Sequence, residues 1–212
     1  PSEIYFTGSA TESNNIVLWS LLYQEKKHVI TSAIEHPAVL KVLDELSFFG
    51  ISYDILPVDS TGLVNPSDLK SVIRKDTALV SIMYVNNEVG TIQPIEDLID
   101  IAKSFSIPFH SDCVQAVGKL PISINTIEAD YMSFSAHKFY GPKGIGFLYK
   151  KEGNHLKPLI IGGSQESNLR AGTENISGIA GLGVAAQLVN TNLNDRIKHL
   201  LQLEDYFKTK LT

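Results

Sequence analysis

Short apolar runs that fit β-strands alternate with longer stretches of helical periodicity along this chain of 212 residues. The candidate strands are IYFT, HVITSA, ISYDILP, ALVSIMYV, IPFHSD, DYMSFS and GIGFLYK. Helical patterns separate several of them, at residues 13–25, 37–49, 66–74 and 94–105. This alternation predicts an α/β fold, in which a mostly parallel mixed sheet is covered by helices on both faces.

Composition and charge argue against a nucleic acid or a membrane as the partner of this chain. The chain is 43% hydrophobic and 19% charged, which is ordinary for a protein with a buried core. Its net charge is −5 and it has no block of basic residues, so we expect no nucleic-acid partner. No apolar run approaches the roughly 18 residues of a membrane helix. The single cysteine fits a reducing compartment, so we expect a cytoplasmic protein without membrane contact.

Polar clusters follow several predicted strands, and ligands of open α/β sheets bind at the carboxyl ends of strands. The hydroxyl-rich segment TGSATESNN, residues 7–15, runs from a strand into a helix. It would form either an anion site at the helix N-terminus or an ordinary N-cap. His36 and Asn87 follow two other strands, and each also fits a structural role, as a hydrogen-bonded ring and as a turn residue.

Asp112 and Lys138 carry the clearest chemical signal. Asp112 ends an apolar strand, and a buried carboxylate there would need a cationic partner or strong donors. Lys138 lies between two predicted strands in SFSAHKFYGPKGIG, where the glycine-rich turn places it at the edge of the sheet. Pyridoxal 5′-phosphate would satisfy all these groups, because it offers a phosphate, a ring, a basic nitrogen and a carbonyl that a lysine can capture.

The segments that carry these residues also carry a family resemblance. SATESNN, EHPAVL, NNEVGTIQPI, DCVQAVGK, SFSAHKFYGPKGIG and RAGTEN occur in this order. With them the chain resembles a cysteine desulfurase of the NifS/IscS type, a class V, fold-type I pyridoxal-phosphate enzyme. The resemblance covers essentially the whole chain, and the block around Lys138 is its most specific part.

The resemblance implies an activity and its partners. Such enzymes take sulfur from L-cysteine, release alanine and leave a persulfide on an enzyme cysteine. The persulfide feeds iron–sulfur cluster assembly or thiolation. The implied partners are therefore L-cysteine, a sulfur-acceptor or iron–sulfur scaffold protein, and a second copy of the chain in a homodimer.

The resemblance also implies roles for the residues around the ring. Lys138 would form the Schiff base with the cofactor and move protons at the substrate α-carbon. Asp112 would pair with the pyridinium nitrogen, and His36 would stack on the ring and act in acid/base steps. Gln115 would hydrogen-bond the phenolic oxygen, and Asn87 would help to hold the substrate side of the ring.

The resemblance also implies which residues would bind the phosphate group of the cofactor. Thr11, Ser135 and His137 would bind the phosphate, with Ala10 in the same cofactor-binding loop. Thr173 would reach the phosphate of the neighbouring subunit, so that the site needs a homodimer. The resemblance implies no metal ligand.

Two segments depart from the family pattern. The phosphate loop usually reads Ser-Gly before Ala-Thr, whereas this chain has Gly8-Ser9, and serine would be strained there if the turn needs a positive φ. The segment GGSQESNLR carries Ser164 and Ser167-Asn168 where the family favours glycine and then Arg-Gly. The resemblance implies that this segment borders the dimer interface and the site, so cofactor affinity or dimer geometry could differ.

We expect residues 1–212 to be the cofactor-binding large domain of a longer enzyme, lacking an N-terminal segment and a C-terminal small domain. Residues 176–212 would form a helix or helix pair leading toward that small domain. The sulfur-accepting cysteine and the arginine for the substrate carboxylate would lie beyond residue 212, so the chain alone should be inactive. Cys113 alternates with Asp112 along a strand, so we expect it to face away from the cofactor as a buried filler.

Other readings of the sequence stay open. The same residues fit another class V activity, such as a selenocysteine lyase or an aminotransferase. They also fit a truncated, non-catalytic module that keeps a dimer surface and binds assembly partners.

Overall fold

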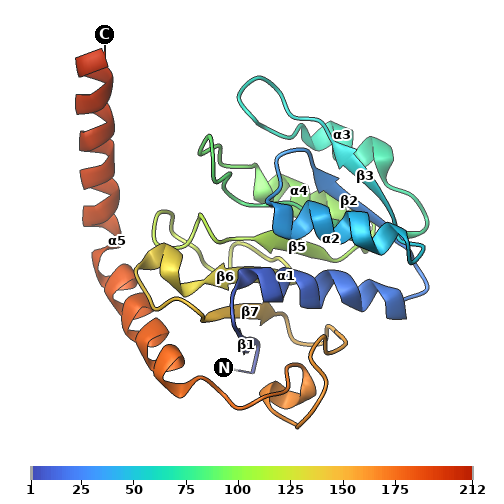
Figure 1. Cartoon of the computed structure of the whole chain (residues 1–212). Helices are drawn as coiled ribbons and strands as arrows, with labels where there is room; N and C mark the ends of the chain where they lie inside the picture. Colours follow the sequence, from blue (N-terminus) through green and yellow to red (C-terminus); the bar gives the residue numbers. More distant parts are fainter. Residues whose placement is uncertain (1, 212) are drawn as a thin grey trace.

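The computed structural model describes residues 2–211, in which seven strands form one sheet with helices on both faces (Figure 1). The strands are β1 (Ile4–Thr7), β2 (His28–Ser32), β3 (Ser52–Leu56), β4 (Thr77–Ser81), β5 (Phe109–Asp112), β6 (Tyr131–Ser135) and β7 (Gly146–Lys150). Their order across the sheet is β1-β7-β6-β5-β4-β2-β3. The strands from β6 to β3 pair in parallel, and β7 is antiparallel to both β6 and β1. The predicted mostly parallel mixed sheet is confirmed.

Two helix pairs cover the sheet. The helices are α1 (Ala10–Trp19), α2 (Pro37–Ser47), α3 (Pro66–Val72) and α4 (Ile95–Ser104). One buried cluster joins Ile16 of α1 and Val39 of α2 to Leu79 of β4. A second cluster joins Leu98 of α4 to Val80 of β4. Because Leu79 and Val80 alternate along one strand, these clusters lie on opposite faces of the sheet, as predicted.

The last helix, α5 (Ile176–Leu211), is one continuous helix rather than a pair. Its first part packs Leu182 and Val189 against Phe139 in the short 3-10 helix η2 (Ala136–Phe139). Its second part extends away from the sheet (Figure 1). Neither α5 nor any other helix within residues 2–211 has the length and apolar composition needed to cross a bilayer.

Two boundaries differ from the sequence expectation for physical reasons. The first helix begins at Ala10 rather than at residue 13, because Ser9 caps it and its Oγ accepts a hydrogen bond from the Glu12 amide at 3.4 Å. The strand expected over residues 78–85 ends at Ser81. Beyond that point β5 is the one strand that still shares backbone hydrogen bonds with this segment among residues 2–211, through Ile82 N to His110 O at 3.1 Å and Tyr84 N to Asp112 O at 3.0 Å.

Gly146 places the start of α1 against the sheet. A Cβ at this position would lie 2.5 Å from the Phe134 carbonyl oxygen and 2.9 Å from the Ser9 Cα. Both are backbone atoms, which cannot move aside as a flexible side chain could. The absence of a side chain at Gly146 therefore allows the loop before α1 to pack directly on β6 and β7.

We expect Gly146→Ala to lower the free energy of unfolding by about 1–3 kcal/mol, because the added methyl group overpacks a backbone contact. Urea unfolding at neutral pH measures this change. Gly183→Ala is the matched control, because the exposed Gly183 of α5 has open space where the Cβ would lie. That variant should be neutral or more stable by up to about 1 kcal/mol. Equal effects of the two substitutions would contradict the argument.

Candidate functional site

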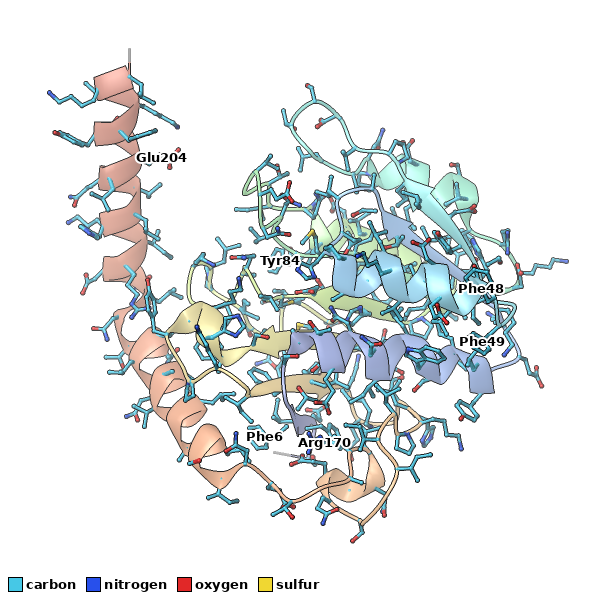
Figure 2. All side chains as sticks on the ribbon, in the orientation of Figure 1. Phe6, Phe48, Phe49, Tyr84, Arg170 and Glu204 are labelled. Carbon is cyan, nitrogen blue, oxygen red and sulfur yellow. The ribbon has the colours of Figure 1, made fainter. Side chains whose placement is uncertain are left out.

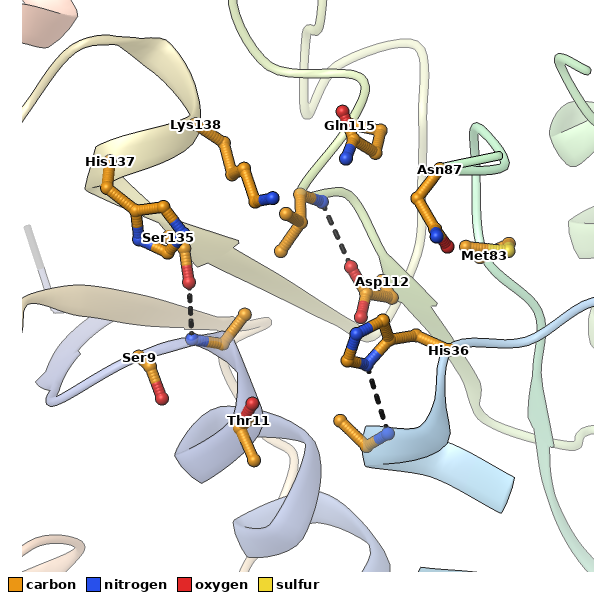
Figure 3. Close-up of a pocket in the computed structure, with 13 residues that line it drawn as sticks. Ser9, Thr11, His36, Met83, Asn87, Asp112, Gln115, Ser135, His137 and Lys138 are labelled. Carbon is orange, nitrogen blue, oxygen red and sulfur yellow. Dashed lines mark hydrogen bonds between the residues drawn. The ribbon is translucent and has the colours of Figure 1, made fainter. Parts of the chain in front are cut away.

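A pocket of about 230 Å³ opens at the carboxyl ends of β4, β5 and β6, between the N-termini of α1 and α2 (Figure 3). Its lining comes from segments that follow different strands. The lining residues are Ser9, Ala10, Thr11, His36, Ala38, Met83, Asn87, Asp112, Val114, Gln115, Ser135, His137 and Lys138. The structure thus brings together every residue that the sequence nominated for the site, with the exception of Thr173.

Asp112 forms the floor of the pocket at the end of β5, with 5% of its surface exposed. Its Oδ1 accepts a hydrogen bond from Val114 N at 3.0 Å, and its Oδ2 accepts one from Asn14 Nδ2 at 2.8 Å. Burial raises the pKa of Asp112, while these two donors and the charges of His36 and Lys138 oppose the rise. Sequence reasoning missed Asn14, whose partner lies far away in the chain.

His36 is held at the start of α2 as its N-cap. Its Nδ1 accepts a hydrogen bond from the Ala38 amide at 3.0 Å (Figure 3). A nitrogen that accepts from an amide carries no proton, so the neutral ring is protonated on Nε2. The ring lies beside Asp112, and Nε2 is the nitrogen left to act in the pocket.

Lys138 lies in η2, directly after β6, and its side chain extends into the pocket from the side opposite His36 (Figure 3). The chain reverses just beyond it, where Tyr140 has a φ of 70° and Gly141 N donates to Ala136 O at 2.8 Å. The neighbouring His137 has a lowered pKa, through partial burial of its ring and the positive charges of Lys138 and Lys143.

The loop before α1 supplies the second end of the pocket. Ser135 Oγ accepts a hydrogen bond from Ala10 N at 2.8 Å, which ties this loop to β6. Thr11 lies in the first turn of α1, where backbone amides and the helix dipole favour an anion. Ser9 has a φ of −174°, which is extended backbone, so the Gly8-Ser9 departure causes no strain.

Gln115 and Asn87 line the remaining wall. Lys119 Nζ donates to Gln115 Oε1 at 2.7 Å, so the amide nitrogen of Gln115 is left free to donate into the pocket. Asn86 orders the loop that carries Asn87, because its Oδ1 accepts from the amides of Glu88 and Val89, each at 2.9 Å. The sequence assigned no role to Lys119, and it explained the two asparagines of this loop by turn chemistry, which the bonds of Asn86 match.

Thr173 lies apart from this pocket, in a smaller hollow of about 100 Å³ that also contains Phe6, Gly8 and Arg170. Of these residues, Figure 2 labels Phe6 and Arg170. Arg170 Nε donates to Glu12 Oε1 at 2.8 Å, and Glu12 Oε2 accepts from Gly8 N at 2.7 Å. The hollow therefore borders the back of the loop that precedes α1. Within one copy of the chain, Thr173 is not part of the site.

The other departure from the family pattern coincides with an unusual backbone. Glu166, Ser167 and Asn168 have φ values of 46°, 55° and 68°, a left-handed run without glycine. Each such residue costs about 1 kcal/mol or more. The segment is held nonetheless, because Glu166 Oε2 accepts a hydrogen bond from Phe6 N at 3.0 Å.

Cys113 follows Asp112 but is fully buried in the cluster on the α4 face of the sheet. Burial raises the pKa of its thiol to about 12. Cys113 is therefore a core residue, as expected, and does not line the pocket. Within residues 2–211, no group of three His, Cys, Asp or Glu side chains could hold a metal ion.

The pocket lies at the carboxyl ends of parallel strands and contains a lysine, a buried aspartate and a helix N-terminus. The chain is therefore an α/β protein of the class that binds its ligand at this edge of the sheet. The chain belongs to the aminotransferase class-V family, whose model matches residues 1–212. Family membership implies pyridoxal phosphate as the cofactor.

Known proteins of similar sequence and structure carry more specific names. The chain is 50% identical over 208 residues to the cysteine desulfurase IscS of Dictyoglomus turgidum, covering 97% of this chain and 53% of that protein. The solved structure of a NifS-like protein is 45% identical with a TM-score of 0.97, covering 100% of this chain and 59% of that one. The structure of SspA in complex with cysteine is also 45% identical, with a TM-score of 0.85. The match covers 88% of this chain and 55% of that one. The chain thus spans about half the length of the relatives it matches.

We expect Asn14→Ala to lower the free energy of unfolding at pH 7 by about 1.5–3 kcal/mol, the range for a hydrogen bond to a charged group. The substitution leaves one oxygen of the buried Asp112 carboxylate without its donor. Asn15→Ala is the matched control, because the partly exposed Asn15 bonds neutral groups and should cost about 1 kcal/mol or less. Equal losses in urea unfolding would show that Asn14 does not stabilise the carboxylate.

Proposed function

We propose that residues 1–212 act as the cofactor-binding domain of a pyridoxal-phosphate-dependent cysteine desulfurase that works in the cytoplasm. The observation that carries the proposal is the meeting of Lys138, Asp112, His36 and the α1 N-terminus in one pocket. The names of the similar proteins support cysteine as the substrate, since they include cysteine desulfurases and a structure in complex with cysteine.

The residues of the pocket fit pyridoxal phosphate. Asp112 is a buried carboxylate whose hydrogen-bond donors, Asn14 and Val114, are both neutral, so a cationic ring nitrogen would complement it. At the other end, the first turn of α1, Ser135 and His137 offer donors for a phosphate. The Asp112 end of the pocket favours a cationic group and the α1 end favours an anionic group. Pyridoxal phosphate has one of each, its ring nitrogen and its phosphate.

When bound, pyridoxal phosphate supplies a conjugated ring that withdraws electrons from bonds at the α-carbon of an amino acid. Asp112 would keep the ring nitrogen protonated, because its carboxylate lines the pocket and has only neutral hydrogen-bond donors. Lys138 Nζ would hold the cofactor and would exchange a proton at the substrate α-carbon. His36 would cover the ring and would exchange a proton through Nε2, since its Nδ1 is occupied by Ala38 N.

The remaining residues of the pocket would bind the cofactor and orient it. Gln115 would donate to the phenolic oxygen, because Lys119 holds its amide oxygen. Asn87 would border the substrate side of the ring. Thr11, with Ala10 in the same loop, would bind the phosphate. Thr173 would serve the site of a second copy in a homodimer, since it lies outside the pocket of its own chain.

The sulfur atom taken from cysteine needs an acceptor outside these residues. Cys113 is the one cysteine of the 212 residues. Burial raises the pKa of its thiol to about 12, so the thiol stays protonated at neutral pH. The acceptor cysteine therefore belongs to another segment or another protein. An iron–sulfur scaffold or a thiolation protein would then receive the sulfur.

We expect Lys138→Ala to abolish covalent trapping of pyridoxal phosphate by borohydride, while part of the cofactor affinity persists through the phosphate donors. Mass spectrometry detects the trapped adduct, and equilibrium dialysis measures the affinity. Lys143→Ala is the control, because Lys143 is exposed in the same glycine-rich turn and lies outside the pocket. Undiminished trapping in Lys138→Ala would overturn the assignment of this lysine.

We expect the 212-residue chain, loaded with pyridoxal phosphate and given L-cysteine and a reductant, to release no sulfide above the cofactor-only background. The reason is that a persulfide needs a positioned, accessible thiolate, which Cys113 does not supply. Cys113→Ser should therefore give the same sulfide and alanine readings as the unsubstituted chain. Stoichiometric alanine that disappears in Cys113→Ser would contradict the expectation.

A further inference from the structure

Glu35 is a buried carboxyl group beside the pocket that the proposed mechanism does not use. It directly precedes His36 in the chain, and 6% of its surface is exposed. Its Oε1 accepts a hydrogen bond from Ser32 Oγ at 2.6 Å and another from Met83 N at 2.8 Å. One oxygen atom thus bridges the segment that ends in His36 and the segment that carries Met83 and Asn87.

The hydrogen bond from Met83 N to Glu35 takes the place of a backbone bond between β2 and β4. The ladder between β2 and β4 ends with the pair Thr31 and Ser81. Beyond it, Tyr84 N donates to Asp112 O on the β5 side at 3.0 Å, whereas Met83 N points to the β2 side, where the carboxyl of Glu35 takes the place of a backbone acceptor. A buried amide without this acceptor would cost about as much free energy as a lost hydrogen bond.

A second contact ties the same two segments together. Asn86 Nδ2 donates to Ile34 O at 2.9 Å, one residue before Glu35. Asn86 also orders the loop that carries Asn87. The separation between His36 and Asn87 across the pocket is therefore set by the Glu35 and Asn86 contacts rather than by strand pairing.

The charge state of Glu35 follows from its surroundings. Within residues 2–211 it has no ion-pair partner, and its Oε2 is buried without a hydrogen bond. Burial raises the pKa of Glu35 to about 8, against the opposing effect of Ser32 and Met83, and the negative charge of Asp112 adds to the rise. The titratable groups that line the adjacent pocket are His36, Asp112, His137 and Lys138.

We propose that Glu35 is a positioning residue, which as a neutral hydrogen-bond acceptor fixes His36 against the segment of Met83 and Asn87 and leaves Asp112 as the carboxylate of the pocket. Its meaning for catalysis rests on the proposed function. The bridge itself belongs to the cofactor-free chain, so it can be tested separately.

The first experiment measures thermal unfolding of the cofactor-free chain from pH 5 to pH 8.5. A native carboxyl that stays protonated while the unfolded one ionises makes stability fall as pH rises between about 4.5 and about 8. Glu35→Gln removes this loss, so its Tm should exceed that of the unsubstituted chain by a margin that grows with pH. Glu45→Gln, on the exposed face of α2, should show no growing margin. Parallel curves for Glu35→Gln and the unsubstituted chain would overturn the neutral state.

The second experiment compares Glu35→Gln with Glu35→Ala by amide hydrogen exchange and by pyridoxal-phosphate affinity. The glutamine oxygen can still accept from Met83 N, so exchange at Met83 and the cofactor Kd should stay within about twofold of the unsubstituted chain. The alanine variant should exchange Met83 at least tenfold faster and bind the cofactor more weakly.

The two readouts separate the bridge from its function. Unchanged exchange at Met83 in Glu35→Ala would overturn the bridge. Fast exchange with unchanged cofactor affinity would overturn the positioning role while leaving the bridge intact. If Glu35→Ala does not fold, Glu35→Gln still decides, because loss of Met83 protection or of cofactor affinity in that variant would contradict the proposal. Failure of pyridoxal phosphate to bind the unsubstituted chain would count against the proposed function alone.

Discussion

The buried carboxylate of Asp112 imposes the condition around which the pocket is organised. An ionised carboxylate removed from water costs several kcal/mol unless other groups replace its hydration. The fold supplies one donor to each oxygen, from Asn14 Nδ2 and Val114 N, and places His36 and Lys138 where their charges favour ionisation. Both direct donors are neutral, so neither of them neutralises a charge on the floor of the pocket. A ligand with a cationic ring nitrogen is the natural complement of that floor.

The placement of α1 serves both ends of this site at once. Its N-terminus faces the pocket, where the proposed phosphate would lie, and one turn further on, Asn14 turns its amide toward Asp112. The close backbone approach at Gly146 and the bond from Ala10 N to Ser135 Oγ fix the helix on β6 and β7. A shift of α1 would therefore disturb the phosphate end and the carboxylate together. The need to hold α1 in place gives a structural reason for Gly146 on β7 and Ser135 on β6.

The fold and most of the pocket could be predicted from the sequence, because their signals are local. Strand and helix periodicity gave the layered sheet, and residues at strand ends, such as Lys138 and Asp112, necessarily meet at one edge of a parallel sheet. Asn14 and Glu35 could not be found in this way. Their roles depend on partners brought close by tertiary packing, Asp112 for the first and Met83 for the second. The cap of α1 is also a local signal, because the N-cap expected as one alternative for residues 7–15 is provided by Ser9.

Two carboxyl groups beside one pocket are pushed toward different charge states by their surroundings. Burial raises the pKa of both, yet Asp112 faces His36 and Lys138, whereas Glu35 has no cationic partner and feels the charge of Asp112. A cation bound at Asp112 would relieve that repulsion and lower the pKa of Glu35. By linkage, ionisation of Glu35 would in turn strengthen binding of the cation. The hydrogen bonds to Ser32 and Met83 persist in either state, since the carboxyl accepts both. Under the proposed role, a change in the charge of Glu35 would therefore leave its bridge to Met83 in place.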